Sequence, residues 1–285
     1  MTSDSRAVID VRAPAKVNLT LRIVGRRADG YHLLDSLVIF AGAADRLRVA
    51  DADRLSLRVE GPFAGSIADP ESNLVVQACR LLAERLERPA AGAFVLDKRL
   101  PVAAGLGGGS ADAAATLRAL LSLWDARIPP ADLAALALRL GADVPACLTG
   151  RPLRMAGVGE DLAPLPDLPP FGLLLANPRV PLSTAAVFKA RRGAFSGPEA
   201  PPAFDGLESL LAFLAASGND LQATAVALCP AVGTVLTAVA ALPGCRIARM
   251  SGSGPTCFGL FATAAEAKAA AALLTRSHPD WWVDA

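Results

Sequence analysis

The sequence of 285 residues contains few of the side chains on which metal sites and disulfide frameworks depend. It has two histidines and five cysteines, and no two cysteines are spaced as a C-x-x-C pair. An odd number of cysteines without such a pair argues against a disulfide framework and against a structural zinc site. We therefore expect buried, reduced cysteines in a cytoplasmic protein.

An excess of charge of one sign is also lacking, since 28 basic residues stand against 27 acidic ones and the formal net charge is +1. The sequence shows no basic run, so we expect no nucleic-acid partner. Residues 221–245 carry no charge, but Pro230 and Gly233 interrupt them. We predict two short buried helices there, divided at Pro230, and no membrane partner. The first residues lack the apolar core of a signal peptide.

Hydrophobic residues make up 53% of the chain, which is enough to build a full core. Residues 15–24 alternate apolar and polar side chains, as a strand does. Asn73 has the position and side chain of an N-cap for the helix that follows it. Because strands and helices follow each other without a regular β-α repeat, the predicted fold class is α+β. The other predicted strands are 33–40, 46–49, 55–59, 94–98, 171–176, 245–250, 256–261 and 281–283, and the predicted helices are 73–86, 111–124, 129–141 and 264–276.

A glycine-rich loop joins the strand ending near Lys98 to the helix at 111–124. Glycines allow backbone N–H groups to approach a ligand closely, and a helix N-terminus favours negative charge. The loop therefore indicates phosphate binding, although a merely flexible connection is the alternative. It is no Walker A loop, because no lysine follows the glycines, and Ser110 stands where a dinucleotide fingerprint has its third glycine. The loop residues are Gly105, Gly107, Gly108, Gly109 and Ser110.

Several other polar residues are candidates for a site. Lys16 and Asn18 lie on the same face of the first predicted strand, although a solvent-facing polar stripe would have the same pattern. Asp143 follows a predicted helix end, where the helix dipole disfavours a carboxylate. A cationic partner or a functional use would explain it, and an ordinary aspartate of a surface loop is the alternative. Tyr31 and His32 are adjacent after a turn and could stack on a planar base, or be ordinary turn residues.

Residues 13–19, 101–110 and 251–255 resemble, in order, the three signatures of the GHMP kinase superfamily. Residues 27–32, 97–101 and 141–145 resemble the branch that phosphorylates a cytidine diphosphate-linked methylerythritol on the non-mevalonate route to isoprenoids. The resemblance implies a two-domain GHMP kinase fold. Its domains would be a ribosomal protein S5 domain 2-like one at 1–160 and a ferredoxin-like one at 161–285. The proline-rich stretch 161–170 is consistent with a boundary there.

The resemblance also implies ATP and Mg²⁺, a small-molecule substrate, and a monomer or homodimer. Asp112 stands where asparagine is common, and residues 191–202 have no counterpart. Two alternatives to this function remain. The chain could be a kinase of homoserine, mevalonate or a sugar, or it could be a nucleotide-binding regulator or an oxidoreductase. The site residues that the resemblance implies are Lys16 and Asp143 for catalysis; Asn73, Lys98, Pro101, Ala104, Gly105, Leu106, Gly107, Gly108, Gly109 and Ser110 for ATP, with Ser110 also for the metal; Asn18, Tyr31, His32, Asp143, Thr184 and Phe188 for the substrate; and Ser251, Gly252, Ser253 and Gly254 for a third loop at the active site.

Overall fold

A computed structural model describes residues 8–67, 69 and 71–285. The chain forms two compact units, each assembled from separate stretches of sequence. The first unit contains the residues up to 15 together with 44–102 and 107–150, and the second contains 16–43, 103–106 and 151–285. The elements, in chain order, are β1 Val8–Asn18, β2 Arg22–Arg26, β3 His32–Ala50, β4 Leu55–Glu60, a short 3₁₀ turn Ala64–Ser66, α1 Leu74–Arg85, β5 Gly92–Asp97, α2 Gly108–Leu123, α3 Pro130–Leu140, α4 Val144–Thr149, β6 Leu153–Gly157, β7 Asp161–Pro164, β8 Gly172–Asn177, α5 Thr184–Ala190, α6 Leu207–Ser217, α7 Gln222–Leu228, α8 Pro230–Ala240, β9 Ile247–Met250, β10 Cys257–Phe261, α9 Ala264–Ser277 and β11 Trp282–Asp284.

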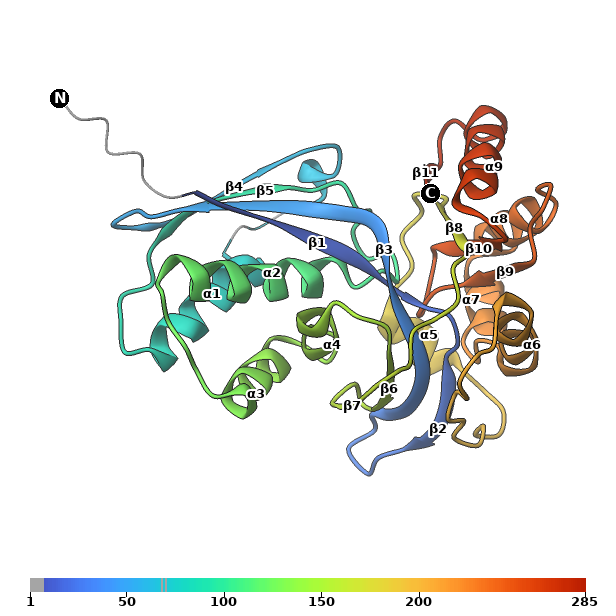
Figure 1. Ribbon diagram of the computed structural model, residues 1–285, viewed down its shortest axis with the longest axis horizontal. Helices are drawn as coiled ribbons and strands as arrows, with labels where there is room; N and C mark the ends of the chain where they lie inside the picture. Colours follow the sequence, from blue (N-terminus) through green and yellow to red (C-terminus); the bar gives the residue numbers. More distant parts are fainter. Residues whose placement is uncertain (1–7, 68, 70) are drawn as a thin grey trace. The chain divides into compact units, whose positions relative to one another are not determined.

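In the first unit, helices cover one face of a sheet. β4 pairs in parallel with β5, and β5 pairs antiparallel with residues 46–50 of β3. α1 and α2 pack against each other beneath these strands, and α3 and α4 pack against α2 (Figure 1). Alanine makes up much of the buried face of α2, which allows the neighbouring helices to approach closely. This packing places the N-terminal turn of α2 at the end of the glycine loop.

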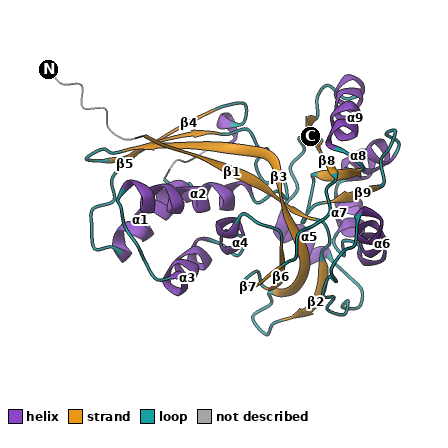
Figure 2. Cartoon of the chain, in the orientation of Figure 1, coloured by secondary structure: helices purple, strands orange, loops and turns teal. Residues whose placement is uncertain are grey.

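The second unit contains a hairpin and a separate four-stranded sheet. β2 pairs antiparallel with β3, whose residues 34–38 also pair with β6. The second sheet is antiparallel throughout, in the order β11-β8-β10-β9, and α8 and α9 pack on it (Figure 2). Its core includes Leu174, Val235 and Phe261, all fully buried. The loop between β9 and β10 carries the third of the sequence motifs.

The α+β fold class is confirmed, as are the two helices divided at Pro230. Three details of the sequence prediction are wrong. Residues 33–40 and 46–49 belong to one continuous strand, β3, and α2 begins at Gly108 rather than Ala111. The stretch 15–24 is divided between β1 and β2, and its polar face is buried, because Lys16 is 4% and Asn18 1% exposed.

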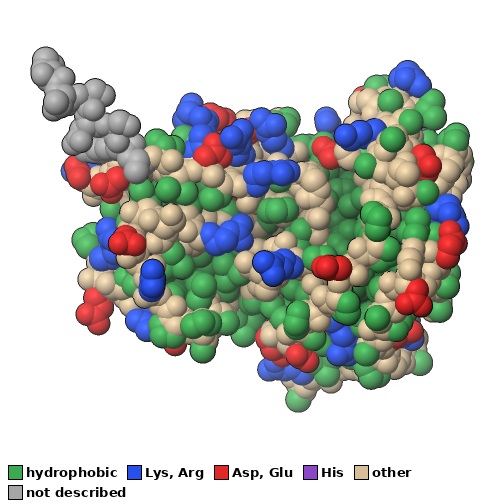
Figure 3. Space-filling model, viewed as in Figure 1, with side chains coloured by type: hydrophobic (Ala, Val, Ile, Leu, Met, Phe, Trp, Pro, Cys, Tyr) green, Lys and Arg blue, Asp and Glu red, His purple; other side chains and the backbone are tan. Residues whose placement is uncertain are grey.

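On the face drawn in Figure 3, lysine and arginine side chains are interspersed with aspartate and glutamate, as the near-zero net charge leads us to expect. Among the residues described, no helix is both long enough and apolar enough to cross a membrane.

The domain boundary expected between 160 and 161 stays a prediction.

Candidate active site

One buried hydroxyl in the second unit joins parts of all three sequence motifs. The Ser251 Oγ accepts a hydrogen bond from the backbone N–H of Asn18 at 3.1 Å and donates one to the carbonyl of Gly105 at 3.0 Å. These residues are 233 and 146 positions away from Ser251 in the sequence. Ser251 itself is fully buried. The structure therefore brings together motifs that the sequence could only place in order.

The end of β1 is fixed beside the glycine loop by its backbone. The N–H of Lys16 donates to the carbonyl of Leu106 at 2.8 Å. Two residues further, the Asn18 amide donates to the Ser36 hydroxyl at 2.7 Å, and that hydroxyl donates to the carbonyl of Thr20 at 2.6 Å. Burying these polar groups is tolerable because each has a hydrogen-bond partner. Their burial excludes the solvent-facing stripe as the explanation of the alternating pattern.

The loop between β9 and β10 lies so close to the glycine loop that only glycine fits. Gly105 has a φ of +72°, and a Cβ there would lie 2.6 Å from the carbonyl oxygen of Ser251 and 2.8 Å from that of Gly254. A Cβ on Gly252 would lie 3.0 Å from the Gly105 carbonyl oxygen. Real Cβ atoms do not approach oxygen at 2.6 Å, so the approach depends on the glycine.

Thr184, at the start of α5, is connected to this third loop. Its hydroxyl lies 2.8 Å from the hydroxyl of Ser253, and either can donate. Ala104 also reaches the loop region, because its carbonyl accepts the N–H of Thr256 at 3.2 Å. The structure thus places Ala104, Thr184 and Ser253 around the same segment, while their contacts with ATP or substrate stay predictions.

His32 and Phe188 form one of the aromatic pairs of the second unit. Their ring centroids lie 5.2 Å apart with an interplanar angle of 36°. Burial lowers the pKa of His32, and the nearby charges of Arg26 and Arg191 lower it further, so the neutral imidazole is favoured. A neutral ring offers one donor and one acceptor to a ligand. Tyr31 is 67% exposed, as a side chain that stacks on a ligand would be.

In the first unit, the glycine loop leads into the first turn of α2. Gly107 is the N-cap residue with a φ of +61°, a conformation that glycine adopts without strain. The free N–H groups of this turn and the helix dipole favour an anion. Gly108, Gly109 and Ser110 form the turn itself, and a Cβ on Gly141 would lie 3.9 Å from the Ser110 hydroxyl.

A buried cluster of charges lies beneath this turn. The Lys98 ammonium contacts Asp45 Oδ2 at 2.5 Å and Asp112 Oδ2 at 2.7 Å, and all three side chains are at most 3% exposed. The other oxygen of Asp45 accepts the N–H groups of Arg99 and Leu100 at 2.6 and 2.8 Å. Oδ1 of Asp112 is buried with no hydrogen-bond partner. The cluster thus connects the two ends of the segment 98–112, which contains the glycine loop.

Two carboxylates share one ammonium in this cluster, and the pKa values of Lys98 and Asp112 are shifted there. Burial alone would lower the pKa of Lys98, but the charges of Asp112 and Asp45 outweigh it and raise the pKa. Burial raises the pKa of Asp112 to about 7, opposed by the charge of Lys98 and reinforced by that of Asp45. The ammonium implied to contact ATP is therefore committed to two carboxylates, and the ATP contact of Lys98 stays a prediction.

The remaining candidates lie in the first unit. Asn73 is the N-cap of α1, where its Oδ1 accepts the N–H of Val75 at 2.9 Å, and Pro101 is buried. Asp143 is the N-cap residue of the six-residue helix α4, which the sequence analysis missed. Its carboxylate is thus near the favourable end of a helix dipole, not only the unfavourable end of α3. Lys16 belongs to the other unit, and the catalytic roles of Lys16 and Asp143 stay predictions.

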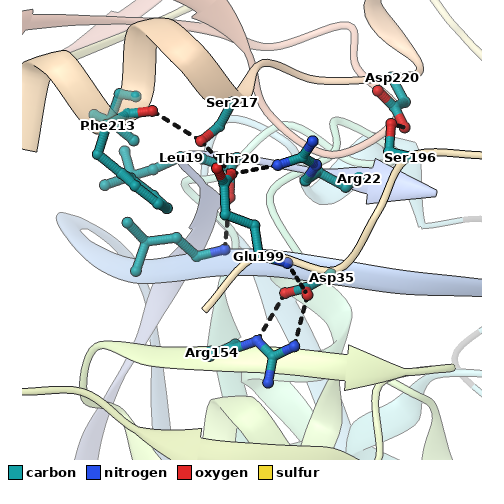
Figure 4. Close-up of polar contacts among 12 residues, drawn as sticks. Leu19, Thr20, Arg22, Asp35, Arg154, Ser196, Glu199, Phe213, Ser217 and Asp220 are labelled. Carbon is teal, nitrogen blue, oxygen red and sulfur yellow. Dashed lines mark hydrogen bonds and ion pairs between the residues drawn. The ribbon is translucent and has the colours of Figure 1, made fainter. Parts of the chain in front are cut away.

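Sequence reasoning missed four acidic residues that organise these regions. Asp45 anchors the glycine-loop segment, as described above. Glu199 contacts Asp35 and Arg22 of the hairpin β2–β3, as Figure 4 shows. Asp220 accepts hydrogen bonds from Ser196 and from Ile23 of β2. None of them belongs to a motif, and their partners are distant in sequence, so no local pattern could have identified them.

The donor set fits a magnesium ion held mainly by phosphates. Among the residues described, no three histidine, cysteine, aspartate or glutamate side chains are grouped to hold a metal. Mg²⁺ commonly keeps its waters and binds through substrate phosphates with one or two protein oxygens. The Ser110 hydroxyl, in the first turn of α2, can supply one such oxygen.

Comparisons with known proteins agree with this geometry. The family model of the GHMP kinases N terminal domain matches residues 73–151, and that of the GHMP kinases C terminal matches residues 202–279. A 4-diphosphocytidyl-2-C-methyl-D-erythritol kinase from Paramagnetospirillum magneticum is 55% identical over 276 residues, which cover 96% of each chain. A protein of the same name from Cereibacter sphaeroides is 54% identical over 275 residues, covering 95% of this chain and 96% of its own.

Solved structures give the same result. A crystal structure of 4-(cytidine 5'-diphospho)-2C-methyl-D-erythritol kinase has a TM-score of 0.79 at 38% identity and covers 96% of this chain and 98% of its own. A homoserine kinase from Cytophaga hutchinsonii, at 19% identity and a TM-score of 0.69, shares the fold and covers 100% of this chain and 96% of its own. With both family models matched and relatives above 50% identity along nearly its whole length, the chain belongs to the GHMP kinase family.

Proposed function

We propose that this chain transfers the γ-phosphoryl group of ATP to the 2-hydroxyl of 4-diphosphocytidyl-2-C-methyl-D-erythritol, in the methylerythritol phosphate route to isoprenoid precursors. The observation that carries the proposal is the Ser251 hydroxyl, which bonds to both Asn18 and Gly105 and so joins the three kinase motifs. The pairing of His32 with Phe188 supports a cytosine ring as the part of the acceptor that is recognised. The names of the relatives support the same acceptor.

The residues of the chain have separate tasks in this reaction. The backbone N–H groups of the loop from Gly105 to Ser110 bind the phosphates, with contributions from Ala104, Leu106 and Pro101, and Asn73 and Lys98 lie at the adenosine. Asn18 helps to hold the diol, and Thr184 lies beside the cytosine pocket. The loop of Ser251, Gly252, Ser253 and Gly254 closes on the active site. His32 hydrogen-bonds to the cytosine edge, and Tyr31 and Phe188 contact its ring faces.

Phosphoryl transfer through a loose transition state depends mainly on positioning and on neutralisation of charge. Asp143 orients the attacking hydroxyl and accepts its proton. Lys16 stabilises negative charge on the group in transfer. Mg²⁺, held by the phosphates and the Ser110 hydroxyl, neutralises further charge when it is bound. A cytoplasmic location and a monomeric or dimeric state also stay predictions.

A coupled assay of ADP release tests the function. The purified protein is given Mg-ATP with the cytidine-linked diol, or with homoserine, mevalonate or galactose at the same concentration. We expect ADP release above background with the cytidine-linked diol alone, and a single new phosphate on its 2-hydroxyl in the ³¹P spectrum of the product. Turnover of another acceptor at a comparable kcat/KM would contradict the proposed substrate, and no turnover of any acceptor would contradict the activity.

A further inference from the structure

The segment between α5 and α6, which no sequence motif explained, is attached to the hairpin β2–β3. We call residues 191–199 the strap. The N–H of Ser196 donates to the carbonyl of Ile23 at 2.9 Å, and its hydroxyl donates to Asp220 Oδ2 at 2.7 Å. The same Asp220 oxygen accepts the N–H of Ile23 at 2.7 Å. Both backbone groups of Ile23 on the outer side of β2 are therefore occupied.

This attachment solves a problem of the hairpin. β2 has five residues and pairs with β3 alone, and the register slips between Ile23 and Gly25. β2 is therefore an edge strand, and the outer edge of such a strand presents unpaired backbone groups. Ser196 of the strap and Asp220, which the Ser196 hydroxyl contacts, supply partners for that edge, so the position of β2 depends on the strap as well as on β3.

Glu199 makes the second attachment (Figure 4). Its N–H donates to Asp35 Oδ2 at 2.9 Å, and its carboxylate pairs with Arg22 at 2.5 Å and accepts the Ser217 hydroxyl at 2.6 Å. Arg22 and Asp35 are directly opposite each other on β2 and β3. Asp35 is 3% exposed and also receives both nitrogens of the Arg154 fork, at 2.9 and 2.6 Å. A single residue of the strap thus contacts both strands of the hairpin.

The other end of the strap is continuous with α5. Arg191 directly follows this helix, its side chain is 7% exposed, and its guanidinium donates to the carbonyls of Gly193 and Ala194. It also lies 4.0 Å from the Asp220 carboxylate. α5 carries Phe188, whereas Tyr31 ends the turn of the hairpin and His32 is the first residue of β3. The strap therefore connects the two elements from which the His32–Phe188 pair is built.

We propose that the strap is a positioning element for the nucleobase pocket, in which Glu199 fixes the hairpin β2–β3 relative to α5 and so sets the spacing of His32 and Phe188. The proposal rests on the proposed function, in which these rings hold the cytosine of the acceptor. The backbone N–H of Glu199 donates to Asp35 and its carboxylate contacts Arg22 and Ser217, so it acts through the hairpin. Its loss changes acceptor binding, while ATP binding and the chemical step stay intact.

The test compares Glu199→Ala and Glu199→Gln with Glu208→Ala. The glutamine keeps an acceptor for Ser217 and the backbone bond to Asp35 but removes the charge that pairs with Arg22. Glu208 is a control in the same unit, since its side chain is 76% exposed and pairs with Arg246 on the surface. We expect Glu199→Ala to raise the KM for the cytidine-linked diol roughly tenfold or more, because small displacements of binding groups have large effects. The KM for ATP and kcat should stay within about twofold, Glu199→Gln should be intermediate, and Glu208→Ala should be unchanged.

A second readout requires no catalysis. The chain has two histidines, so ¹⁵N-histidine NMR gives separable signals for His32 and His278. We expect Glu199→Ala to shift the His32 signals and leave those of His278, which is stacked on Trp281, in place. Shifted His32 signals in a protein that phosphorylates none of the acceptors would overturn the proposed function and support the strap. Unchanged His32 signals and an unchanged acceptor KM in a folded Glu199→Ala protein would overturn the strap. Equal changes at both histidines with higher KM for both substrates would overturn it too.

Discussion

The Ser251 hydroxyl is effective because a hydroxyl can donate and accept at the same time. It accepts from the backbone of Asn18 and donates to Gly105, so one side chain satisfies two buried backbone groups from distant segments. No other small side chain except threonine offers this, and cysteine forms much weaker hydrogen bonds. At the scale of a single residue, the geometry of the site depends on buried hydrogen-bonding side chains such as Ser251 rather than on exposed side chains.

Replacement of Asp143 by asparagine tests its proposed role. The amide keeps the shape of the side chain but cannot take the proton of the attacking hydroxyl, so we expect kcat to fall about a hundredfold. The Kd for the acceptor, measured calorimetrically, should change little. Asp132→Asn is the matched control, because Asp132 is an exposed aspartate of the same unit that pairs with Arg85. A near wild-type kcat for Asp143→Asn would refute the role.

Asp112→Asn tests the buried charge cluster through stability. Because burial raises the pKa of Asp112 to about 7, the native state binds more protons than the unfolded state between about pH 4 and pH 7. The free energy of unfolding of the wild type should therefore fall as the pH rises through this range. Asparagine does not titrate, so the free energy of unfolding of the variant does not fall in this way. We therefore expect its Tm to exceed that of the wild type by about 3 °C at pH 8, which corresponds to a difference in free energy on the order of 1 kcal/mol.

The measurement is thermal unfolding of both proteins in EDTA, at pH 5 and pH 8. The Tm difference should be smaller at pH 5, where Asp112 of the wild type is protonated. A variant that is less stable than the wild type at pH 8, or a difference independent of pH, would show that Asp112 is not the group concerned.

The sequence could predict those residues whose role is decided locally. Asn73 was identified as an N-cap because its partner is two residues away, and Pro230 was identified as a helix start by its fixed φ. Asp45 and Glu199 could not be identified, because their partners lie on other strands and helices. The resemblance supplied the candidate site residues, whose roles stay predictions, but it could not indicate that the Lys98 ammonium is shared by two carboxylates.

At the scale of elements, the difference between local and distant contacts also explains the errors in the predicted bounds of helices and strands. α2 begins inside the glycines, although glycine is an unfavourable helix residue, because the packing of α1 and α4 against the helix compensates for it. β3 was predicted as two strands because residues 41–43 interrupt the pattern of large apolar side chains. Its two halves pair with different partners, β6 and β5, while the backbone stays extended between them.

Gly105→Ala tests the close approach of the two loops in the second unit. A methyl group would meet the carbonyl oxygens of Ser251 and Gly254, and the φ of +72° would be strained as well. We expect a Tm several degrees lower and turnover reduced at least tenfold, measured by thermal unfolding and ADP release. Gly65→Ala is the control, because a Cβ on Gly65 has no atom within 4 Å. Wild-type turnover in Gly105→Ala would show that the loops can separate without consequence.

At the scale of the whole molecule, ligands should stabilise the fold by mass action. Mg-ADP at about a hundred times its Kd should add ~2.7 kcal/mol to the free energy of unfolding, which for this chain length corresponds to a rise in Tm of roughly 5–10 °C. EDTA should remove most of this rise, because the phosphates are then bound without the metal.

Cytidine diphosphate should give a separate rise in Tm that EDTA affects less, since the proposed pocket recognises the base through His32, Tyr31 and Phe188. Differential scanning fluorimetry with each nucleotide and with both together measures these effects. If ADP and cytidine diphosphate compete rather than add, the two nucleotides share one site and the assignment of the aromatic residues is wrong.

The discontinuity of the two units has a consequence for biosynthesis. Residues 16–43 leave the ribosome early, but the remainder of their unit, chiefly residues 151–285, follows only after the whole stretch 44–150. At roughly 5–20 residues per second, the nascent β2 edge waits on the order of ten seconds for the strap that covers it. The other unit can be completed in the meantime, while β2, although paired with β3, still lacks the partners of its outer edge. Chaperones that bind nascent chains would find their target at this edge.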